Sequence, residues 1–427
     1  MTDFKDRVGL SLWILLFLGI LMMNTYATEP GITIIPDHHD YLYHLGEKAK
    51  FEVKVIPAEI MRKDQKLEYE FSEDGAVKIS TGTLSIKDHI LLECAMDKPG
   101  FLRLDILLKM EEKQFRSSAA VAYAPELIKP SVSLPVDFTS FWNLAKAELE
   151  RIPMDVKLEH RPQLSDNEIA IYKISMANIE NVRFYGWLAI PGTKGKHGAV
   201  VYIPGAGVEP LPPLKDYAKA DLVTFFLEIH GMDVETSPGI YAEHRRTDLD
   251  GYQFLGMGDP SHYYYRRVLL SVVRAISYLE QREDVDPGRI GVAGSSQGGG
   301  LSIIAASIDP RVKAITANVP AFCDHLGHYY GRPSGWPQFW KRFPRDVIEK
   351  TASYYDAALA ARNVKARALL TVGFIDDICM PTTVYAAYNN LSGEKKMEHY
   401  PQMRHELPEE LRLHLVNWLS GQLKKSP

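Results

Sequence analysis

Hydrophobic and polar residues follow two different periods along this chain. In residues 30–125, apolar residues alternate with charged ones, as at Phe51, Val53 and Val55. Further short segments of this kind cover 66–71, 76–86, 89–95, 101–109 and 117–123. Period-two alternation between turn-like boundaries is typical of strands that bury one face. The pattern predicts an all-β sandwich of immunoglobulin-like type over residues 28–125, although its sequence lacks the Cys-Trp-Cys core of antibody domains.

The pattern changes after a proline-containing segment. Residues 126–136 include Pro130 and Pro135 and show no periodicity, which predicts a linker. Beyond it, Phe138 and Trp142 recur at helical spacing. The change from a period of two to helical spacing therefore marks the boundary between an all-β region and a region of another fold class.

From residue 137 to residue 427, predicted strands alternate with predicted helices. Apolar runs of the length of buried parallel strands cover 198–203, 222–229, 290–293, 314–318 and 369–374. Helical stretches cover 264–282, 298–308, 381–391 and 408–423. This alternation predicts an α/β domain with a doubly wound, mostly parallel sheet over residues 137–427.

The first residues resemble a targeting segment. Residues 8–23 are an unbroken apolar run preceded by Lys5 and Arg7, and the run is shorter than the roughly 20 residues of a membrane-spanning helix. Thr25 and Ala27 place small residues at positions −3 and −1 of a cleavage site. We expect a signal peptide over residues 1–27, export to the periplasm, cell surface or medium, and no stable membrane span after cleavage. An uncleaved N-terminal anchor is the alternative.

Composition and charge narrow the class of protein. The 427 residues are 46% hydrophobic and 24% charged, values that suit a large globular core and exclude a mainly disordered, collagen-like or multi-span membrane protein. The formal net charge of −5 and the lack of a basic run argue against nucleic acid as a partner. Cys94, Cys323 and Cys379 are widely spaced, which excludes a disulfide framework and a cysteine-rich zinc site.

One predicted strand leads into a motif for nucleophilic catalysis. The sequence IGVAGSSQGGG contains the G-x-S-x-G pattern centred on Ser296, in which a sharp turn from strand to helix exposes the serine hydroxyl. Gly294 and Gly298 remove the Cβ atoms that would collide in so tight a turn. The backbone N–H of Gln297, at the start of the next helix, is the expected oxyanion donor. Ser295 falls at the wrong register for the nucleophile and is expected to support it.

A nucleophilic serine requires a base and an acid, which follow it in the order acid, then histidine, in this type of fold. Asp376 and Asp377 come directly after the predicted strand at 369–374, and His405 precedes the last helix. The positions predict a Ser296, Asp376, His405 triad. Spacing alone does not decide between Asp376 and Asp377.

Two further segments are candidates for the same site. The loop after the strand at 198–203 contains Gly205 and Gly207, and glycine lets a backbone N–H approach a ligand closely, so we expect the second oxyanion donor there. The insertion 325–343 is rich in aromatic residues. Its Tyr329, Tyr330, Trp336 and Trp340 are candidates for a wall that stacks on sugar rings. A packed structural insertion or a subunit contact is the alternative.

Four segments together resemble the acetyl xylan esterase and cephalosporin C deacetylase family of α/β-hydrolases. They are 263–300, 317–323, 374–389 and 404–406, and the resemblance reaches across about residues 130–425. It implies removal of acetyl groups from acetylated sugars and xylo-oligosaccharides by a serine, without a metal or another cofactor. Carried over by position, it assigns Ser296 as nucleophile, His405 as base and Asp376 as acid.

The resemblance also has departures. The family's second oxyanion donor belongs to a tyrosine, and that position falls near Gly205, which implies a more open acyl pocket. The family's Arg-Gly-Gln signature is replaced by His230-Gly231-Met232, which puts the local structural network and the quaternary arrangement in doubt. A homo-oligomer therefore stays possible.

Other functions fit the same pattern. A feruloyl or glucuronoyl esterase or a prolyl-peptidase-like enzyme would use the same fold. Such a peptidase carries a propeller of four to eight blades, which does not fit into residues 30–125, so the sequence disfavours the peptidase. An inactive carbohydrate-binding surface protein is the alternative outside the enzymes. Because Ser296, Asp376 and His405 are all present, the sequence favours an enzyme.

Overall fold

The computed structural model describes residues 31–56, 65–86, 89–110 and 113–424. The predicted signal peptide, its apolar run and its cleavage site lie outside these residues. Among the described helices, none is long and apolar enough to cross a membrane.

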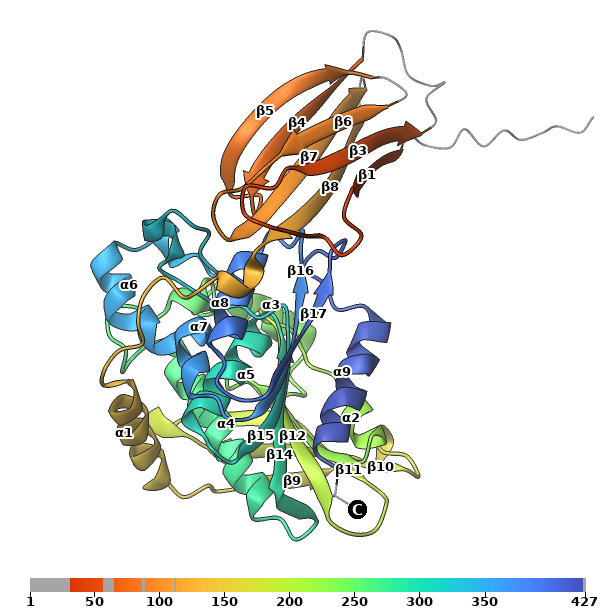
Figure 1. Ribbon diagram of the computed structural model, residues 1–427. Coiled ribbons are helices and arrows are strands. Elements are labelled where there is room, and N and C mark those ends of the chain that lie inside the picture. The colour runs from red at the N-terminus through yellow and green to blue at the C-terminus, as the bar shows by residue number, and fades with distance from the viewer. Residues whose placement is uncertain (1–30, 57–64, 87–88, 111–112, 425–427) are drawn as a thin grey trace, which may run out of the picture.

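Residues 31–123, here called the N-terminal sandwich, form two facing sheets (Figure 1). The strands are β1 (Gly31–Pro36), β2 (Leu42–Tyr43), β3 (Ala49–Ile56), β4 (Lys66–Glu73), β5 (Val77–Ser85), β6 (Ile90–Cys94), β7 (Gly100–Met110) and β8 (Lys113–Tyr123). One sheet has the order β1-β3-β6 and the other β2-β8-β7-β4-β5. Phe51, Phe71 and Leu104 are buried between them, as the alternating pattern predicts. The predicted all-β region is therefore confirmed.

Residues 138–422, here called the α/β region, are built around a nine-stranded sheet with the order β17-β16-β15-β14-β12-β13-β11-β10-β9. Its strands are β9 (Lys157–His160), β10 (Ile169–Ala177), β11 (Arg183–Pro191), β12 (His197–Ile203), β13 (Leu222–Glu228), β14 (Val285–Ser295), β15 (Val312–Asn318), β16 (Arg367–Gly373) and β17 (Lys395–Tyr400). Neighbouring strands are parallel to one another in the part of the sheet with the order β17-β16-β15-β14-β12-β13. The strands β11, β10 and β9 each pair antiparallel with the strand before them in the sheet. The mostly parallel sheet is as predicted.

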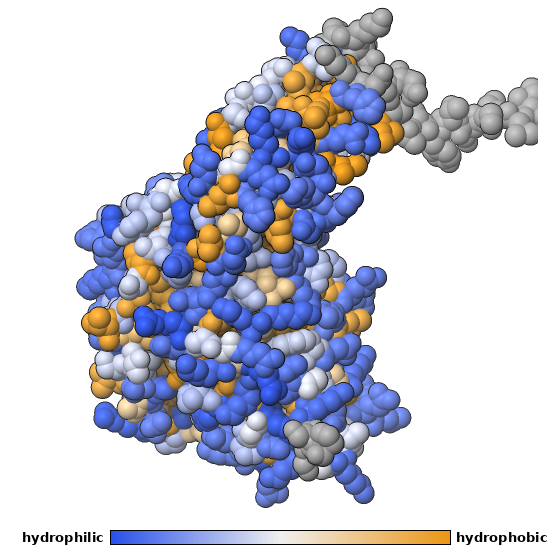
Figure 2. Space-filling view, in the orientation of Figure 1, coloured by the Kyte–Doolittle hydropathy of each residue, from blue (hydrophilic) through white to orange (hydrophobic). Residues whose placement is uncertain are grey.

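Helices cover both faces of this sheet, with α9 and α2 on one side and α4, α5 and α8 on the other (Figure 1). The helices are α1 (Phe138–Glu150), α2 (Asp216–Lys219), α3 (Pro238–Arg246), α4 (Tyr264–Glu280), α5 (Gln297–Ile308), α6 (Arg345–Thr351), α7 (Ala357–Ala360), α8 (Pro381–Asn390) and α9 (Glu409–Gln422). Because both faces are covered, the central strands β13 and β16 are almost entirely buried and mostly apolar. On the face in Figure 2, hydrophilic residues predominate and apolar ones are scattered.

The sandwich contacts the α/β region near the ends of β16 and β17 (Figure 1). The buried carboxylate of Asp74 accepts hydrogen bonds from the backbone N–H and the hydroxyl of Thr382, at 3.2 and 2.6 Å. The ring of Phe101 packs against Phe374 and Tyr385, with centroids 4.9 and 5.5 Å apart. This contact places the sandwich beside the carboxyl ends of the parallel strands.

Candidate active site

Ser296 occupies a strained turn between β14 and α5. Its φ of 56° and ψ of −118° lie in a region that few residues other than glycine adopt. A Cβ at Gly294 would lie 2.4 Å from the carbonyl carbon of Gly298, and a Cβ at Gly298 would lie 2.0 Å from the oxygen of Ile203. Both positions therefore require glycine, which is the steric reason for the G-x-S-x-G pattern.

A continuous chain of hydrogen bonds links the serine to a buried carboxylate. Nε2 of His405 lies 2.8 Å from Oγ of Ser296, and Nδ1 lies 2.8 Å from Oδ2 of Asp376. An ionised carboxylate only accepts hydrogen bonds, so Nδ1 carries the proton and Nε2 accepts from the serine hydroxyl. The structure thus brings together the three residues that the sequence predicted.

The second oxygen of Asp376 fixes the carboxylate in place. Its Oδ1 accepts hydrogen bonds from the backbone N–H groups of Ile378 and Cys379, at 2.8 and 2.9 Å. Asp376 is fully buried, and all of these partners come from the loop after β16 or from His405. The backbone of its own loop therefore orients the carboxylate toward the histidine.

The N-terminus of α5 faces the loop that follows β12. The first N–H groups of a helix have no partner within it, so the N–H of Gln297 is available at this end. The Gln297 side chain is buried, and its Nε2 donates to the carbonyl of Gly205 at 3.2 Å. Its Oε1 accepts from the hydroxyls of Tyr252 and Tyr265, at 2.8 and 2.5 Å. Gln297 therefore holds the Gly205 loop next to the nucleophile turn.

His230 supports the same loop from the other side. Its Nε2 lies 2.7 Å from the carbonyl of Gly207, and its Nδ1 lies 2.7 Å from the hydroxyl of Tyr264. Burial lowers the pKa of His230 to about 4, so the ring is neutral at pH 7. Because a carbonyl only accepts, Nε2 donates to Gly207 and Nδ1 accepts from Tyr264. His230, the first of the three residues that replace the family's Arg-Gly-Gln signature, thus supports this loop.

Glu228 holds the turn that carries His230. Its carboxylate accepts from the backbone N–H groups of His230 and Met232, at 3.0 and 2.8 Å. Burial raises the pKa of Glu228 to about 7 in spite of these hydrogen bonds. This buried carboxyl group fixes the backbone of the turn, a role that the sequence did not indicate.

Asn318 joins the nucleophile strand to the histidine loop. Its amide donates to Oγ of Ser295 at 2.8 Å and to the carbonyl of Glu406 at 3.2 Å. Its oxygen accepts from the hydroxyl of Thr371 at 2.6 Å. Ser295 has the supporting position that its register predicts, while the function of Asn318 was not predicted. The only sequence signal for Asn318 is its place at the end of a parallel strand next to β14.

The aromatic residues of the insertion pack mainly on one another and on the α/β core. Trp340 stacks on His328 with centroids 3.8 Å apart, and Trp336 packs at right angles to Phe322 at 5.5 Å. Arg345 lies 5.3 Å from the ring centres of both Tyr329 and Tyr330. Among the described residues, no hydrogen bond or ring contact joins these four aromatic residues to the serine, histidine and aspartate. Their role as a sugar-stacking wall stays a prediction.

The described residues contain no cluster of three or more His, Cys, Asp or Glu side chains that could hold a metal ion. The cysteines are unpaired, and burial raises the thiol pKa of Cys323 and Cys379. The site that the structure assembles is thus a hydroxyl, an imidazole and a carboxylate beside two backbone segments that offer N–H groups.

Comparison with known proteins identifies the family. A sequence profile described as acetyl xylan esterase matches residues 126–422. The acetyl esterase Axe7A of Xylanibacter ruminicola is 32% identical over 400 residues, which cover 91% of this chain and 90% of that protein. Because this alignment covers 91% of the chain, it extends beyond residues 126–422 and includes most of the sandwich.

Solved structures agree with this result. An acetyl xylan esterase from a Paenibacillus species superposes with a TM-score of 0.61 at 28% identity, over 70% of this chain and 98% of that one. Acetyl xylan esterase 1 from a Thermoanaerobacterium species has a TM-score of 0.60 at 23% identity, over 69% and 97%, and shows the same fold. The chain belongs to the acetyl xylan esterase family of α/β-hydrolases and is a carboxylic ester hydrolase.

Proposed function

We propose that this protein is a serine esterase that removes acetyl groups from acetylated xylan, xylo-oligosaccharides or related acetylated sugars. The observation that carries the proposal is the unbroken chain of hydrogen bonds from Ser296 through His405 to Asp376. The names of the relatives in both comparisons support acetyl esters as substrates.

In the proposed mechanism, His405 accepts the proton of Ser296 as Oγ attacks the ester carbonyl. Asp376 holds the tautomer in which Nε2 is free to accept, and it stabilises the imidazolium that forms. His405 then donates the proton to the leaving sugar oxygen, which leaves an acetyl-enzyme. Water enters, gives a proton to His405 and attacks the acetyl carbonyl, and acetate departs as the serine regains its proton.

The backbone N–H groups of Gln297 and Gly205 are the proposed oxyanion donors. Both segments are preorganised, because the Gln297 side chain binds the Gly205 carbonyl and the two tyrosine hydroxyls at the same time. One such donor contributes about 3–4 kcal/mol to stabilisation of the transition state. Without a side chain at Gly205, the acyl pocket is open on that side.

The first experiment is acetate release from acetylated xylo-oligosaccharides by the wild type and by Ser296→Ala. We expect the variant to lose about 10³-fold or more of kcat and the wild type to prefer p-nitrophenyl acetate to the butyrate. Feruloylated and glucuronoyl esters test the alternative substrates on the same fold. Turnover of those esters without acetate release from sugars would keep the chemistry and refute the substrate. Sugar binding without any Ser296-dependent hydrolysis would favour the inactive carbohydrate-binding protein.

We also propose that residues 1–27 are a signal peptide, that the mature chain is exported, and that residues 28–125, 126–136 and 137–427 are the sandwich domain, linker and catalytic domain. The hydrogen bonds of Thr382 to Asp74 and the packing of Phe101 on Phe374 support a mature protein that contains both the sandwich and the α/β region. N-terminal sequencing of the protein from its native host would test this, with a start near Thr28 as the expected result.

A further inference from the structure

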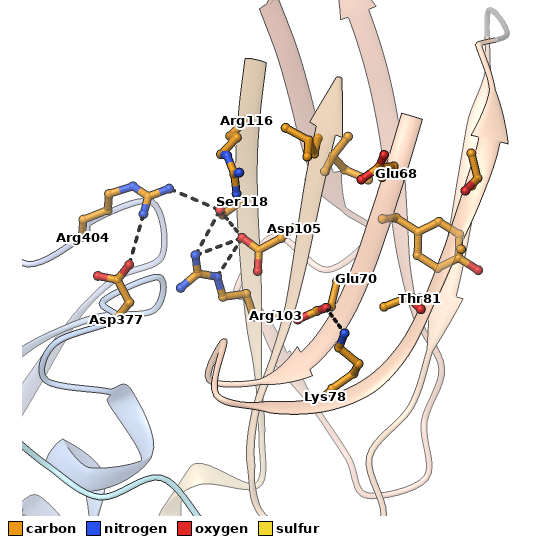
Figure 3. A pocket seen from close by; sticks show the side chains of 15 residues that line it. Glu68, Glu70, Lys78, Thr81, Arg103, Asp105, Arg116, Ser118, Asp377 and Arg404 are labelled. Atoms are coloured by element: carbon orange, nitrogen blue, oxygen red, sulfur yellow. Dashed lines mark hydrogen bonds and ion pairs between the residues drawn. The ribbon is translucent and has the colours of Figure 1, made fainter. Parts of the chain in front are cut away.

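A polar groove lies between the sandwich and the loops of the candidate active site (Figure 3). It has a volume of about 650 Å³. One wall is the outer face of the sheet formed by β4, β5, β7 and β8, where Glu70, Asp105, Arg116 and Ser118 lie. The other wall is formed by Asp377 and Arg404 of the α/β region. The groove is therefore shared by the two parts of the chain.

The wall from the α/β region adjoins the proposed catalytic residues in the chain. Asp377 follows Asp376, and Arg404 precedes His405. While Asp376 and His405 contact one another, Arg404 reaches the sandwich and donates to Oγ of Ser118 at 3.3 Å. The groove therefore borders the two loops that carry Asp376 and His405.

The carboxylates on the sandwich wall already have cationic partners. Asp105 pairs with Arg103 at 2.9 Å, and Glu70 pairs with Lys78 at 2.9 Å. Glu68, the remaining carboxylate of this wall, pairs with Lys109 at 2.6 Å. Each sandwich carboxylate therefore has a cation beside it, which offsets its repulsion of an anion in the groove.

Two guanidinium groups that line the groove, those of Arg116 and Arg404, have N–H donors without a close acceptor among the described residues. Arg116 is exposed, and its one hydrogen bond among the described residues is a 3.5 Å contact with Oε1 of Gln114. Arg404 is half-exposed, and its ion pair with Asp377 is long, at 3.8 Å, so that no hydrogen bond joins the two side chains. Ser118, which Arg404 contacts, is two residues from Arg116 on the same face of β8. Both guanidinium groups therefore border one stretch of the groove.

We propose that this groove binds the carboxylate of a uronic acid carried by the acetylated saccharide. A guanidinium presents a planar fork of N–H donors that matches a carboxylate, and the pair is stronger than a hydrogen bond between neutral groups. Paired ions, Ser118 and Thr81 supply further donors and acceptors for sugar hydroxyls. The proposal rests on the proposed function and names its substrate class: acetylated oligosaccharides with an acidic branch.

The test measures binding apart from turnover. Calorimetry compares an unacetylated xylo-oligosaccharide that carries one uronic acid with its neutral counterpart, on the full chain. We expect the wild type to bind the acidic probe about 10-fold more tightly, the gain of one charged hydrogen-bonded pair. Arg116→Gln is expected to abolish most of this difference, and added salt to reduce it. Arg367→Gln, which removes an exposed guanidinium at the start of β16, is the matched control and should retain it.

Turnover gives the second readout. Acetate release from acidic and neutral acetylated oligosaccharides should show the same preference in kcat/KM for the wild type, and Arg116→Gln should lose this preference. Equal binding of both probes by the wild type, or an equal loss for both in Arg116→Gln, would overturn the proposed groove ligand. Because the probes carry no ester, a failure of the esterase proposal appears only in acetate release and is distinguishable from a failure of the groove.

Discussion

Asp376 and Asp377 are neighbours in the chain, but only Asp376 contacts His405. Its Oδ2 lies 2.8 Å from Nδ1 of His405, and the side chain is fully buried. The carboxylate of Asp377 lies 3.8 Å from Nη1 of Arg404, and its side chain is 56% exposed. Two adjacent and identical side chains thus face different surroundings, one the candidate catalytic site and the other the groove.

This arrangement predicts opposite results for two matched substitutions. Asp376→Asn should lower kcat by about 10⁴-fold, because an amide in place of the carboxylate favours the wrong tautomer of His405. Asp377→Asn should leave kcat within about 3-fold, since its ion pair is exposed. Both variants are compared by acetate release at pH 7, with unfolding temperature as the control for folding. A larger loss in Asp377→Asn than in Asp376→Asn would refute the assignment of the acid.

The second oxyanion donor can be tested at Gly205 with one pair of variants. Gly205→Pro deletes the backbone N–H but keeps the carbonyl that accepts from Gln297. It is expected to lower kcat about 10²–10³-fold with little change in KM. A Cβ at this position would meet only the oxygen of Ser295, at 3.7 Å, so Gly205→Ala should fold and retain kcat. A folded proline variant with normal kcat would exclude Gly205 as a donor.

Asn318 is predicted to position the histidine loop. Asn318→Ala removes the hydrogen bonds to Ser295 and Glu406 and should lower kcat about 10-fold while KM changes little, because His405 loses an anchor of its loop. Asn389→Ala is the matched control, since its amide also donates to two carbonyls, of Pro125 and Ile128, at 2.8 Å. It should lower the unfolding temperature without changing kcat. Equal effects on kcat in both variants would reduce Asn318 to a structural residue.

The sequence predicted those elements whose environment imposes a pattern. The central strands, such as β13 and β16, are buried on both faces and are therefore mostly apolar. Strands β9 and β17 were not predicted, because they lie at the two edges of the sheet and include exposed polar residues. The antiparallel strands β10 and β11 were missed as well, since β10 mixes polar with apolar residues. Period alone does not separate such strands from loops.

The candidate site shows the same limit. Ser296 is marked by glycines that steric contact requires, so its position could be read directly from the sequence. The choice between Asp376 and Asp377 depends on the direction of two side chains, which spacing does not encode. Asn318 and the groove depend on contacts between segments that are distant in the sequence, such as Arg404 with Ser118. These relationships appear only when the chain is folded.

The last prediction concerns the contact between the two parts of the chain. Burial raises the pKa of Asp74 from 3.8 to about 7, although Thr382 donates two hydrogen bonds to it. Between these pH values the folded chain binds a proton that the unfolded chain has lost, so the free energy of unfolding falls as pH rises from about 4 to 7.

Asp74→Asn should remove this dependence. The amide tolerates the positive φ of 52° at this position, it retains an acceptor for the N–H of Thr382, and it carries no charge. At pH 8 the variant should be more stable than the wild type by roughly 2–4 kcal/mol, at about 1.4 kcal/mol per pKa unit, and at pH 4 the two should be nearly equal. Urea unfolding at a series of pH values measures this, with the exposed Asp250→Asn as control. A variant that is less stable at pH 8 would show that the charged carboxylate stabilises the contact.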